Sequence, residues 1–187
     1  MRCRTLVTWA SCSRIEESLA IRLETHWDHD PVRRLLTAAF GRSAEARLVD
    51  ELRESDSFVP NLCLVAEQNS VIVGHILFSH VTLEADPAAQ VLALAPVAVY
   101  PAFQGRGIGS ALIREGLARA EARGEPLVVV LGHPDYYPRF GFVPASSLGI
   151  ESPWPDIPDE AFMAKPLSSY RQDMRGVVRY PAAFDVV

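Results

Sequence analysis

The sequence predicts a single domain of the mixed α/β class, in which helices pack on a central sheet. Two observations support this fold class. Apolar periodicity gives the element order β-α-α-β-β-β-α-β-α-β-β, with helical and extended segments mixed along the chain. The 187 residues are 49% hydrophobic and 22% charged, which is an ordinary globular composition at a length suited to one domain.

The N-terminal part of the chain divides into two regions. Residues 1–17 show no periodicity, and we expect them to form a disordered extension. Residues 18–187 are expected to form the domain. The alternation from Leu19 to Leu23 predicts its first strand.

Two helices are predicted next. Asp30-Pro31 supplies an N-cap and a proline at the first helical position of a helix that ends before Gly41. A second helix is expected from about Glu45 to Arg53, and the segment from Ser55 to Pro60 is expected to end it.

The middle of the chain predicts three strands and a long helix. Segments Leu62–Glu67 and Val71–Leu83 are rich in β-branched residues and predict an antiparallel hairpin. Val91–Tyr100 is almost entirely apolar, as is typical of a strand buried on both faces. A helix is predicted from about Gly107 to Arg123, closed by Gly124.

The remaining segments complete the expected sheet. Leu127–Leu131 predicts an apolar strand, and a short helical turn is expected near Asp135–Phe140. A strand from Phe142 and a last strand near Phe162–Lys165 follow.

Charge and cysteine content exclude several classes of function. The formal net charge of −5 and the pI near 5.5 argue against binding to nucleic acid or to an anionic membrane surface. Cys3, Cys12 and Cys63 have no metal-ligand spacing and leave an odd number for disulfides, so we expect a reducing, cytoplasmic setting and no metal site. Leu6–Cys12 is too short and too polar to predict a signal peptide or a membrane helix.

Gln104–Gly109, with the sequence QGRGIG, lies between the buried strand and the long helix. Glycines at such a turn let backbone N–H groups approach a ligand, and a helix N-terminus favours anions. A Walker A loop would need Gly-Lys-Ser/Thr here, and a dinucleotide fingerprint would need glycine at Ser110 or Leu112. Both patterns are missing, so neither type of loop is predicted. The alternative to an anion site is that the glycines only form a tight turn.

The pattern that remains, Gln/Arg-x-x-Gly-x-Gly, is matched by Gln104, Gly107 and Gly109. It resembles the acyl-CoA pyrophosphate loop of the GNAT N-acetyltransferase superfamily. Leu94–Ile113 and Asp135–Phe142, with the closing Phe162-Met163, are similar to the YhbS-like predicted acetyltransferases of that superfamily. The resemblance extends from about Leu19 to the C-terminus.

The resemblance implies a splayed sheet with CoA in a V-shaped gap between the strand ending at Tyr100 and the strand Leu127–Leu131. It implies acetyl-CoA as cosubstrate, with the pantetheine arm on the backbone of Val97, Ala98 and Val99. The pyrophosphate loop implied by the family comprises Gln104, Gly105, Arg106, Gly107, Ile108, Gly109 and Ser110.

The resemblance also suggests how acetyl transfer would proceed, by direct attack of a primary amine in a ternary complex. The backbone amide of Val99 or its neighbour is the expected oxyanion donor. Tyr137 matches the family pattern Tyr-x-x-x-Gly-Phe and is the candidate general acid for the leaving thiolate. The alternative for Tyr137 is a packing aromatic with a satisfied hydroxyl, and Tyr136 is expected to be structural.

No general base is assigned, because residues 91–99 contain no Asp, Glu or His. Glu67, His80, Glu84 and His133 are conceivable bases, and a water chain could also remove the ammonium proton. His133-Pro134 departs from the asparagine common in the superfamily at this place, which bears on the acceptor pocket.

The acceptor and the functional class remain open at this point. A small-molecule amine is slightly favoured over a protein amine, and Trp154–Pro158 could wall an acceptor groove. A non-catalytic acyl-CoA-binding module or sensor is the alternative from another class. We expect no nucleic-acid or membrane partner, and either a monomer or a homodimer.

Overall fold

The computed structural model describes residues 19–85 and 87–186, so the extension expected over residues 1–17 lies outside the described part. The strands are β1 (Leu19–Leu23), β2 (Phe58–Gln68), β3 (Val71–Glu84), β4 (Ala89–Val99), β5 (Leu127–Leu131), β6 (Val143–Pro144), β7 (Ile150–Glu151), β8 (Phe162–Pro166) and β9 (Gly176–Arg179). The α-helices are α1 (His29–Phe40), α2 (Ala44–Arg53) and α3 (Ile108–Ala122). The 3₁₀ turns are η1 (His26–Asp28), η2 (Pro101–Phe103), η3 (Tyr137–Phe140), η4 (Ala145–Leu148), η5 (Asp159–Ala161) and η6 (Ala182–Val186).

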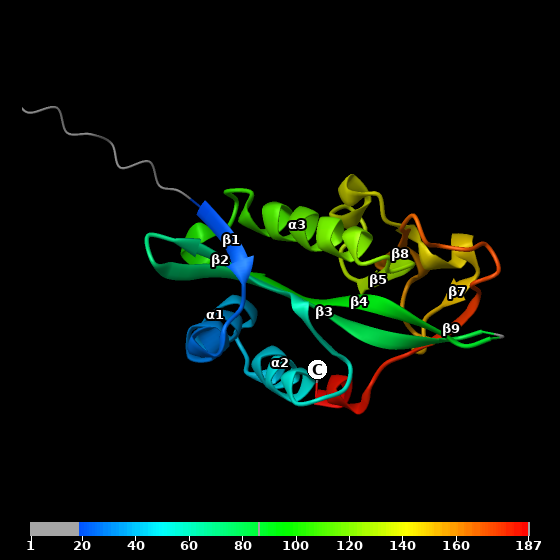
Figure 1. Ribbon diagram of the computed structural model, residues 1–187, viewed down its shortest axis with the longest axis horizontal. Helices are drawn as coiled ribbons and strands as arrows, with labels where there is room; N and C mark the ends of the chain where they lie inside the picture. The colour runs from blue at the N-terminus through cyan, green and yellow to red at the C-terminus, as the bar shows by residue number, and fades with distance from the viewer. Residues whose placement is uncertain (1–18, 86, 187) are drawn as a thin grey trace, which may run out of the picture.

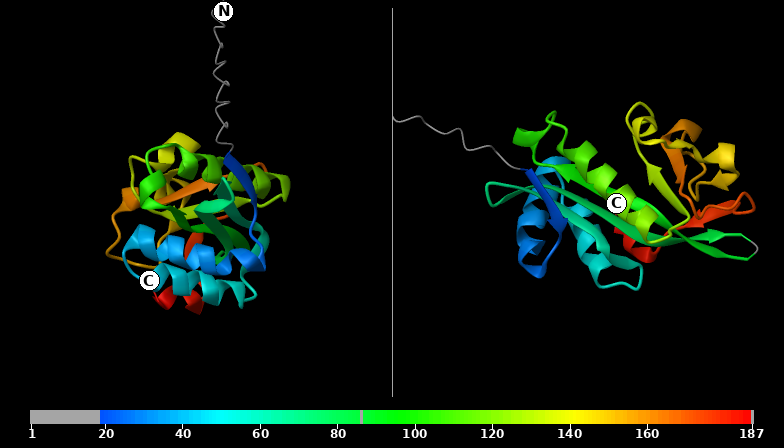
Figure 2. Two further views of the ribbon diagram at one scale, coloured as in Figure 1. Left: turned by 90° about the vertical axis from the view of Figure 1, so that its left-hand side faces the viewer. Right: turned by 45° about the horizontal axis from the view of Figure 1, so that its top comes forward.

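The predicted mixed α/β class is confirmed. In the described residues the strands form one sheet with the order β1-β2-β3-β4-β5-β8-β6, and β9 joins β3 to β7. Strands β1 to β4 are antiparallel neighbours, whereas β4 and β5 are parallel. Helix α3 covers one face of the sheet, and α1 and α2 cover the other (Figures 1 and 2).

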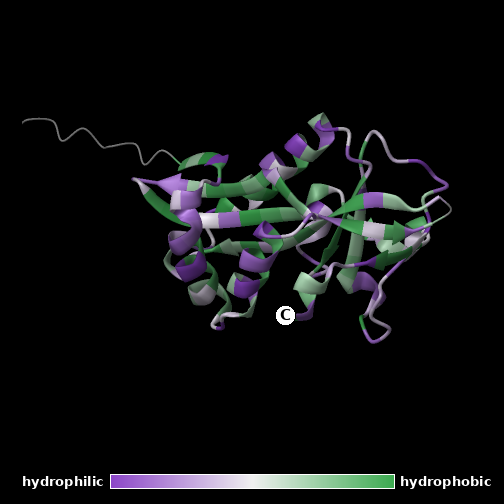
Figure 3. Ribbon diagram, turned by 60° about the horizontal axis from the view of Figure 1, so that its bottom comes forward, coloured by the Kyte–Doolittle hydropathy of each residue, from purple (hydrophilic) through white to green (hydrophobic). Residues whose placement is uncertain are grey.

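The core is divided among these layers. One apolar cluster joins α3 to the sheet, a second joins α1 and α2 to the opposite face, and a third fills the space around β5, β8 and β9. Figure 3 shows mostly apolar strands under helices that carry polar stripes. No α-helix of the described residues is long and apolar enough to cross a membrane.

Helix α3 approaches the sheet closely at Gly116. A Cβ atom built on this glycine would lie 2.3 Å from Cε2 of Phe78, whose side chain is fully buried in β3. A glycine in mid-helix costs helix stability, so its packing role explains its presence.

The sheet opens between β4 and β5, which gives it the expected splay. These strands pair only at Leu92–Val128 and Ala93–Val129. Just beyond, Ala95 and Pro96 of β4 lie opposite the single residue Leu77 of β3, which is a β-bulge. A bulge bends its strand, so β4 leaves β5 from this point onward.

The N-terminus of the first helix differs from the prediction at Asp30-Pro31. Helix α1 begins earlier, at His29, with Asp28 as its N-cap residue, so Pro31 is its third residue. Asp28 is fixed by Arg22 at 2.7 Å and by the backbone N–H of Thr25 at 2.8 Å. The contact with Arg22 comes from β1, which a local capping pattern does not reveal.

The second helix ends at Arg53, as predicted, but the predicted strands were wrong in two places. The strand predicted from Leu62 begins earlier, because β2 already starts at Phe58. The strand Phe162–Lys165 is not the last one: β9 follows it and pairs with β3 and with β7, neither of which is a sequence neighbour. Strands of four and two residues have no periodicity to detect.

Candidate active site

A cleft of about 1490 Å³ occupies the opening between β4 and β5. It reaches from the start of α3 to the segments that follow β7 and β9. All but one of the residues predicted for the cofactor and for catalysis line this cleft, and the exception is Arg106. The lining residues are Val97, Ala98, Val99, Gln104, Gly105, Gly107, Ile108, Gly109, Ser110 and Tyr137.

The backbone of β4 presents an open edge to this cleft. The N–H of Tyr100 donates to the carbonyl of Val73 in β3 at 2.9 Å. Hydrogen-bonded and non-hydrogen-bonded pairs alternate in an antiparallel ladder, so Val99 and Val97 form non-hydrogen-bonded pairs with β3. Their N–H and C=O groups therefore point away from β3, toward the side where β5 has departed. Ala98, in contrast, directs its backbone groups to His75.

The loop before α3 is shaped by glycines in the left-handed conformation. Gly105 has φ of 75° and Gly107 has φ of 83°, and a Cβ built on either would meet no atom within 4 Å. The first intrahelical bond runs from the N–H of Ala111 to the carbonyl of Gly107. The N–H groups of Ile108, Gly109 and Ser110 consequently have no intrahelical acceptor, and no side chain caps the helix. Free N–H groups at a helix N-terminus are suited to binding an anion.

Two side chains of this loop contact its own backbone. Gln104 donates its side-chain amide to the carbonyl of Val99 at 3.0 Å, which ties the loop to the end of β4. Arg106 lies outside the cleft lining: it donates to the carbonyl of Ala102 at 3.1 Å and its guanidinium lies 5.1 Å from the Phe103 ring centroid.

Tyr136 connects the turn after β5 to the start of α3. Its hydroxyl lies 3.4 Å from Oγ of Ser110, and a Cβ on Gly109 would be 3.3 Å from it. Arg139 stacks on its ring at 4.4 Å and donates to its carbonyl at 2.9 Å. Tyr136 also lines the cleft, so its expected structural role stays a prediction.

Tyr137 is buried against the end of β5, and its ring fills the space where Gly132 has no side chain. Among the described residues its hydroxyl has no hydrogen-bond partner. Burial, and secondarily the nearby Tyr136, raises the pKa of Tyr137 to about 12. The group is therefore a neutral, protonated hydroxyl in the wall of the cleft.

Of the four side chains considered as bases, only His133 lines the cleft. The other three lie elsewhere and have side-chain partners: Glu67 contacts Arg22 at 2.8 Å, His80 contacts Glu125 at 3.4 Å, and Glu84 contacts Arg179 at 2.9 Å.

Several lining residues were missed by the sequence analysis. The carboxylates Glu45 and Asp185 and the aromatic residues Tyr180 and Phe184 meet in the cleft from α2, η6 and the segment between β9 and η6. Trp154, predicted as a possible wall, joins them. Figure 1 shows η6 beside α2, across the sheet from α3. The only signal in the sequence was the concentration of aromatic residues after β9.

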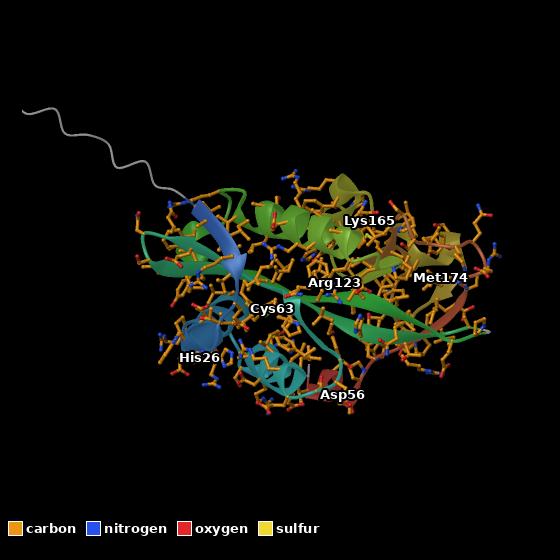
Figure 4. All side chains as sticks on the ribbon, in the orientation of Figure 1. His26, Asp56, Cys63, Arg123, Lys165 and Met174 are labelled. Carbon is orange, nitrogen blue, oxygen red and sulfur yellow. The ribbon has the colours of Figure 1, made fainter. Side chains whose placement is uncertain are left out.

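A buried polar cluster lies on the face of the sheet covered by α1 and α2, where Figure 4 labels Cys63. Cys63 Sγ lies 3.0 Å from Glu24 Oε2 and 3.4 Å from His75 Nε2. These three residues could surround a metal ion, but Arg53 already binds the same carboxylate at 2.6 Å. Burial, followed by the charge of Glu24, raises the pKa of the Cys63 thiol. The protonated thiol of Cys63 and the ion pair of Glu24 with Arg53 balance their charges, so this cluster packs without needing a metal ion.

Comparison with known proteins agrees with this geometry. The sequence model of the acetyltransferase (GNAT) domain family matches residues 20–145 of this chain. The uncharacterized N-acetyltransferase YjhQ of Escherichia coli K12 is 40% identical over 157 residues, which cover 81% of this chain and 86% of YjhQ. The uncharacterized N-acetyltransferase YhbS of the same strain is 32% identical over 168 residues, covering 89% of this chain and 99% of YhbS.

Solved structures extend the comparison to three dimensions. The crystal structure of E. coli YhbS in complex with CoA has a TM-score of 0.82 at 31% identity, covering 90% of this chain and 93% of that one. A GNAT family acetyltransferase from Brucella melitensis, in complex with acetyl-CoA, has a TM-score of 0.75 at 34% identity, covering 91% and 100%. With its splayed sheet, its glycine loop and these relatives, the chain belongs to the GNAT N-acetyltransferase family.

Proposed function

We propose that this enzyme transfers the acetyl group of acetyl-CoA directly to a primary amine within a ternary complex. The observation that carries the proposal is a single cleft that combines the open edge of β4 with the unbonded N–H groups at the start of α3. The relatives from E. coli and Brucella melitensis, crystallised with CoA and acetyl-CoA, support the choice of donor.

The two parts of the cleft suit the two parts of the donor. The N–H groups of Ile108, Gly109 and Ser110 would hold the pyrophosphate, since Gly105 and Gly107 leave the approach free of side chains. The backbone groups of Val97 would pair with the pantetheine amides, as an added strand would. The carbonyl of Val99 already accepts from Gln104, and its N–H remains for the reacting carbonyl. The backbone groups of Ala98 pair with His75 of β3, so Ala98 would not bond to the pantetheine itself but would hold its two neighbours in place.

Acetyl transfer needs a donor for the developing oxyanion and a proton for the leaving thiolate. The N–H of Val99 points into the cleft and would stabilise the oxyanion. Tyr137 would donate its proton to the thiolate. Its pKa of about 12 exceeds that of an ordinary thiol by about 3.5 units, or about 5 kcal/mol. Desolvation of the thiolate in the same cleft raises the thiol pKa and narrows this gap.

The amine must lose a proton before or during attack. His133 and Glu45 both line the cleft and could accept it directly or through water. Glu45 is held at the start of α2 by Arg42, whose Nε lies 3.0 Å from the carboxylate. A small-molecule amine is our preferred acceptor. The cytoplasmic location and the monomeric or homodimeric state stay predictions.

The test is Tyr137→Phe, which removes the hydroxyl and keeps the ring against Gly132. We expect kcat for thiol release to fall about 100-fold, as for loss of a general acid, with an unchanged Kd for acetyl-CoA. Tyr170→Phe, outside the cleft lining, is the matched control and should keep full activity.

Two outcomes would contradict the proposal. An unchanged kcat in Tyr137→Phe would remove Tyr137 from the mechanism. Tight binding of acetyl-CoA by the wild-type protein, without thiol release in the presence of a broad panel of amines, would favour an acyl-CoA-binding module.

A further inference from the structure

Three aromatic side chains form a continuous row in the part of the cleft beside α2, which we call the aromatic wall: Trp154, Tyr180 and Phe184. The ring centroids of Trp154 and Tyr180 are 4.8 Å apart, and those of Tyr180 and Phe184 are 4.7 Å apart. Trp154 lies after β7, Tyr180 and Phe184 lie four positions apart after β9, and all three rings line the cleft.

The aromatic wall has surface left to contact a ligand. Trp154 is 39% exposed. Its loop is held by the bond from the N–H of Trp154 to Oγ of Ser152 at 3.1 Å and by nearby prolines. The Tyr180 hydroxyl has no hydrogen-bond partner among the described residues, and burial raises its pKa, so it remains a neutral donor.

The charges around the aromatic wall disfavour an anionic ligand. Arg42 is paired with Glu45, and Arg179 with Glu84 at 2.9 Å. Asp185 follows Phe184 directly, and in the described part of the chain it has no ionic partner. This part of the cleft therefore has no unpaired cation and one free carboxylate.

The remaining cation of the cleft lies elsewhere. Arg139 stacks on Tyr136, whose hydroxyl contacts the start of α3, at the end suited to the pyrophosphate. A negatively charged acceptor would thus find no free guanidinium at the aromatic wall.

We infer that the acceptor is a primary amine on an aromatic or other apolar body that carries no negative charge. This inference rests on the proposed acetyl transfer at the same site. The body would pack on the aromatic wall, and Asp185 would favour approach of the ammonium form. In the reaction the C–S bond of the thioester breaks and a C–N bond forms. The ammonium ion loses one proton to a cleft base or water before attack. The thiolate receives the proton of Tyr137, and the second proton, lost from the nitrogen after attack, restores Tyr137.

The first experiment measures binding alone, so that it does not depend on turnover. The complex of the protein with CoA is titrated calorimetrically with 2-phenylethylamine, phenylalanine and ethanolamine. The first keeps the aromatic ring without a carboxylate, the second adds the carboxylate, and the third lacks the ring. We expect 2-phenylethylamine to bind at least tenfold more tightly than either of the others. Equal or reversed affinities would overturn the inference.

The second experiment uses variants of the aromatic wall. Trp154→Ala should weaken 2-phenylethylamine about tenfold and leave the Kd for CoA unchanged, whereas Trp154→Phe should stay within about threefold of wild type. Trp27→Ala, at an 80% exposed tryptophan outside the cleft, is the matched control and should bind normally. If Trp154→Ala does not weaken 2-phenylethylamine, or weakens ethanolamine equally, the wall does not select the acceptor.

Turnover with acetyl-CoA separates this inference from the proposed function. If 2-phenylethylamine binds through the aromatic wall but no thiol is released, acetyl transfer fails and the recognition of the amine body stands. If thiol is released with polar or anionic amines in preference to 2-phenylethylamine, acetyl transfer stands and the inference on the acceptor fails.

Discussion

The start of α3 offers a direct test of the donor site through a single added charge at Gly107. Gly107→Glu places a carboxylate beside the unbonded N–H groups of the helix, and Gly107→Gln places an uncharged side chain of the same shape there. Both replace a glycine with φ of 83°, so both carry the same backbone strain of about 1–2 kcal/mol. Comparing the two variants leaves the charge as the only difference.

The size of the charge effect follows from Coulomb's law. At a separation of about 7 Å and an effective dielectric constant of about 20, one pair of like charges costs about 2 kcal/mol. A pyrophosphate carries two negative charges, and salt at about 0.1 M screens the sum by about half. The net penalty of about 2 kcal/mol corresponds to about a 30-fold higher Kd for acetyl-CoA in Gly107→Glu than in Gly107→Gln.

The assay is calorimetric titration with acetyl-CoA at two salt concentrations. The ratio of the two Kd values should shrink as salt rises, since the repulsion is screened. Both variants should melt about 2–8 °C below wild type, by equal amounts, because the strain is the same. Equal Kd values for Gly107→Glu and Gly107→Gln would show that the pyrophosphate does not bind at this helix start.

Two further predictions concern the fold. Burial raises the pKa of Glu24, but His75 and Arg53 outweigh it and lower that pKa to about 2. A carboxylate with a lowered pKa stabilises the fold above pH 4.5, and this stabilisation is lost as pH falls toward 2. Glu24→Gln should therefore lower the free energy of unfolding, measured with urea, by about 3 kcal/mol at pH 7 and by much less at pH 2.5. A constant cost would contradict this. Gly116→Ala should lower the melting temperature by several degrees despite better helix propensity, and Phe78→Leu should restore part of the loss if the contact with the ring is the cause.

The long elements of the fold could be predicted because their patterns are local. Helix α3, the buried strand β4 and the hairpin of β2 and β3 each have enough periodic residues to define their type. The turn between β2 and β3 uses Asn69 and Ser70 at φ of 51° and 62°, which closes the hairpin predicted from the two flanking segments. The glycine loop before α3 was equally visible, because its pattern lies in consecutive residues.

The remaining features depend on contacts between distant segments. The bulge at Ala95 and Pro96 exists only relative to Leu77, and it decides which β4 amides reach the cleft. Strand β9 forms on edges supplied by β3 and β7. Glu45 and Asp185 line one cleft although 140 positions separate them, because η6 packs against α2. No spacing rule connects such residues.

The open edge of β4 has a consequence for how such enzymes diversify. A donor site made of main-chain amides tolerates exchange of the apolar side chains at Val97 and Val99, because the groups that would hold acetyl-CoA belong to every amino acid. The surface beside α2 is built from side chains instead, so substitutions there would change the acceptor that fits the proposed site. Relatives that share the glycine loop can thus keep one donor while their acceptors drift apart, and the identity of Trp154 and Tyr180 should track acceptor chemistry better than overall similarity does.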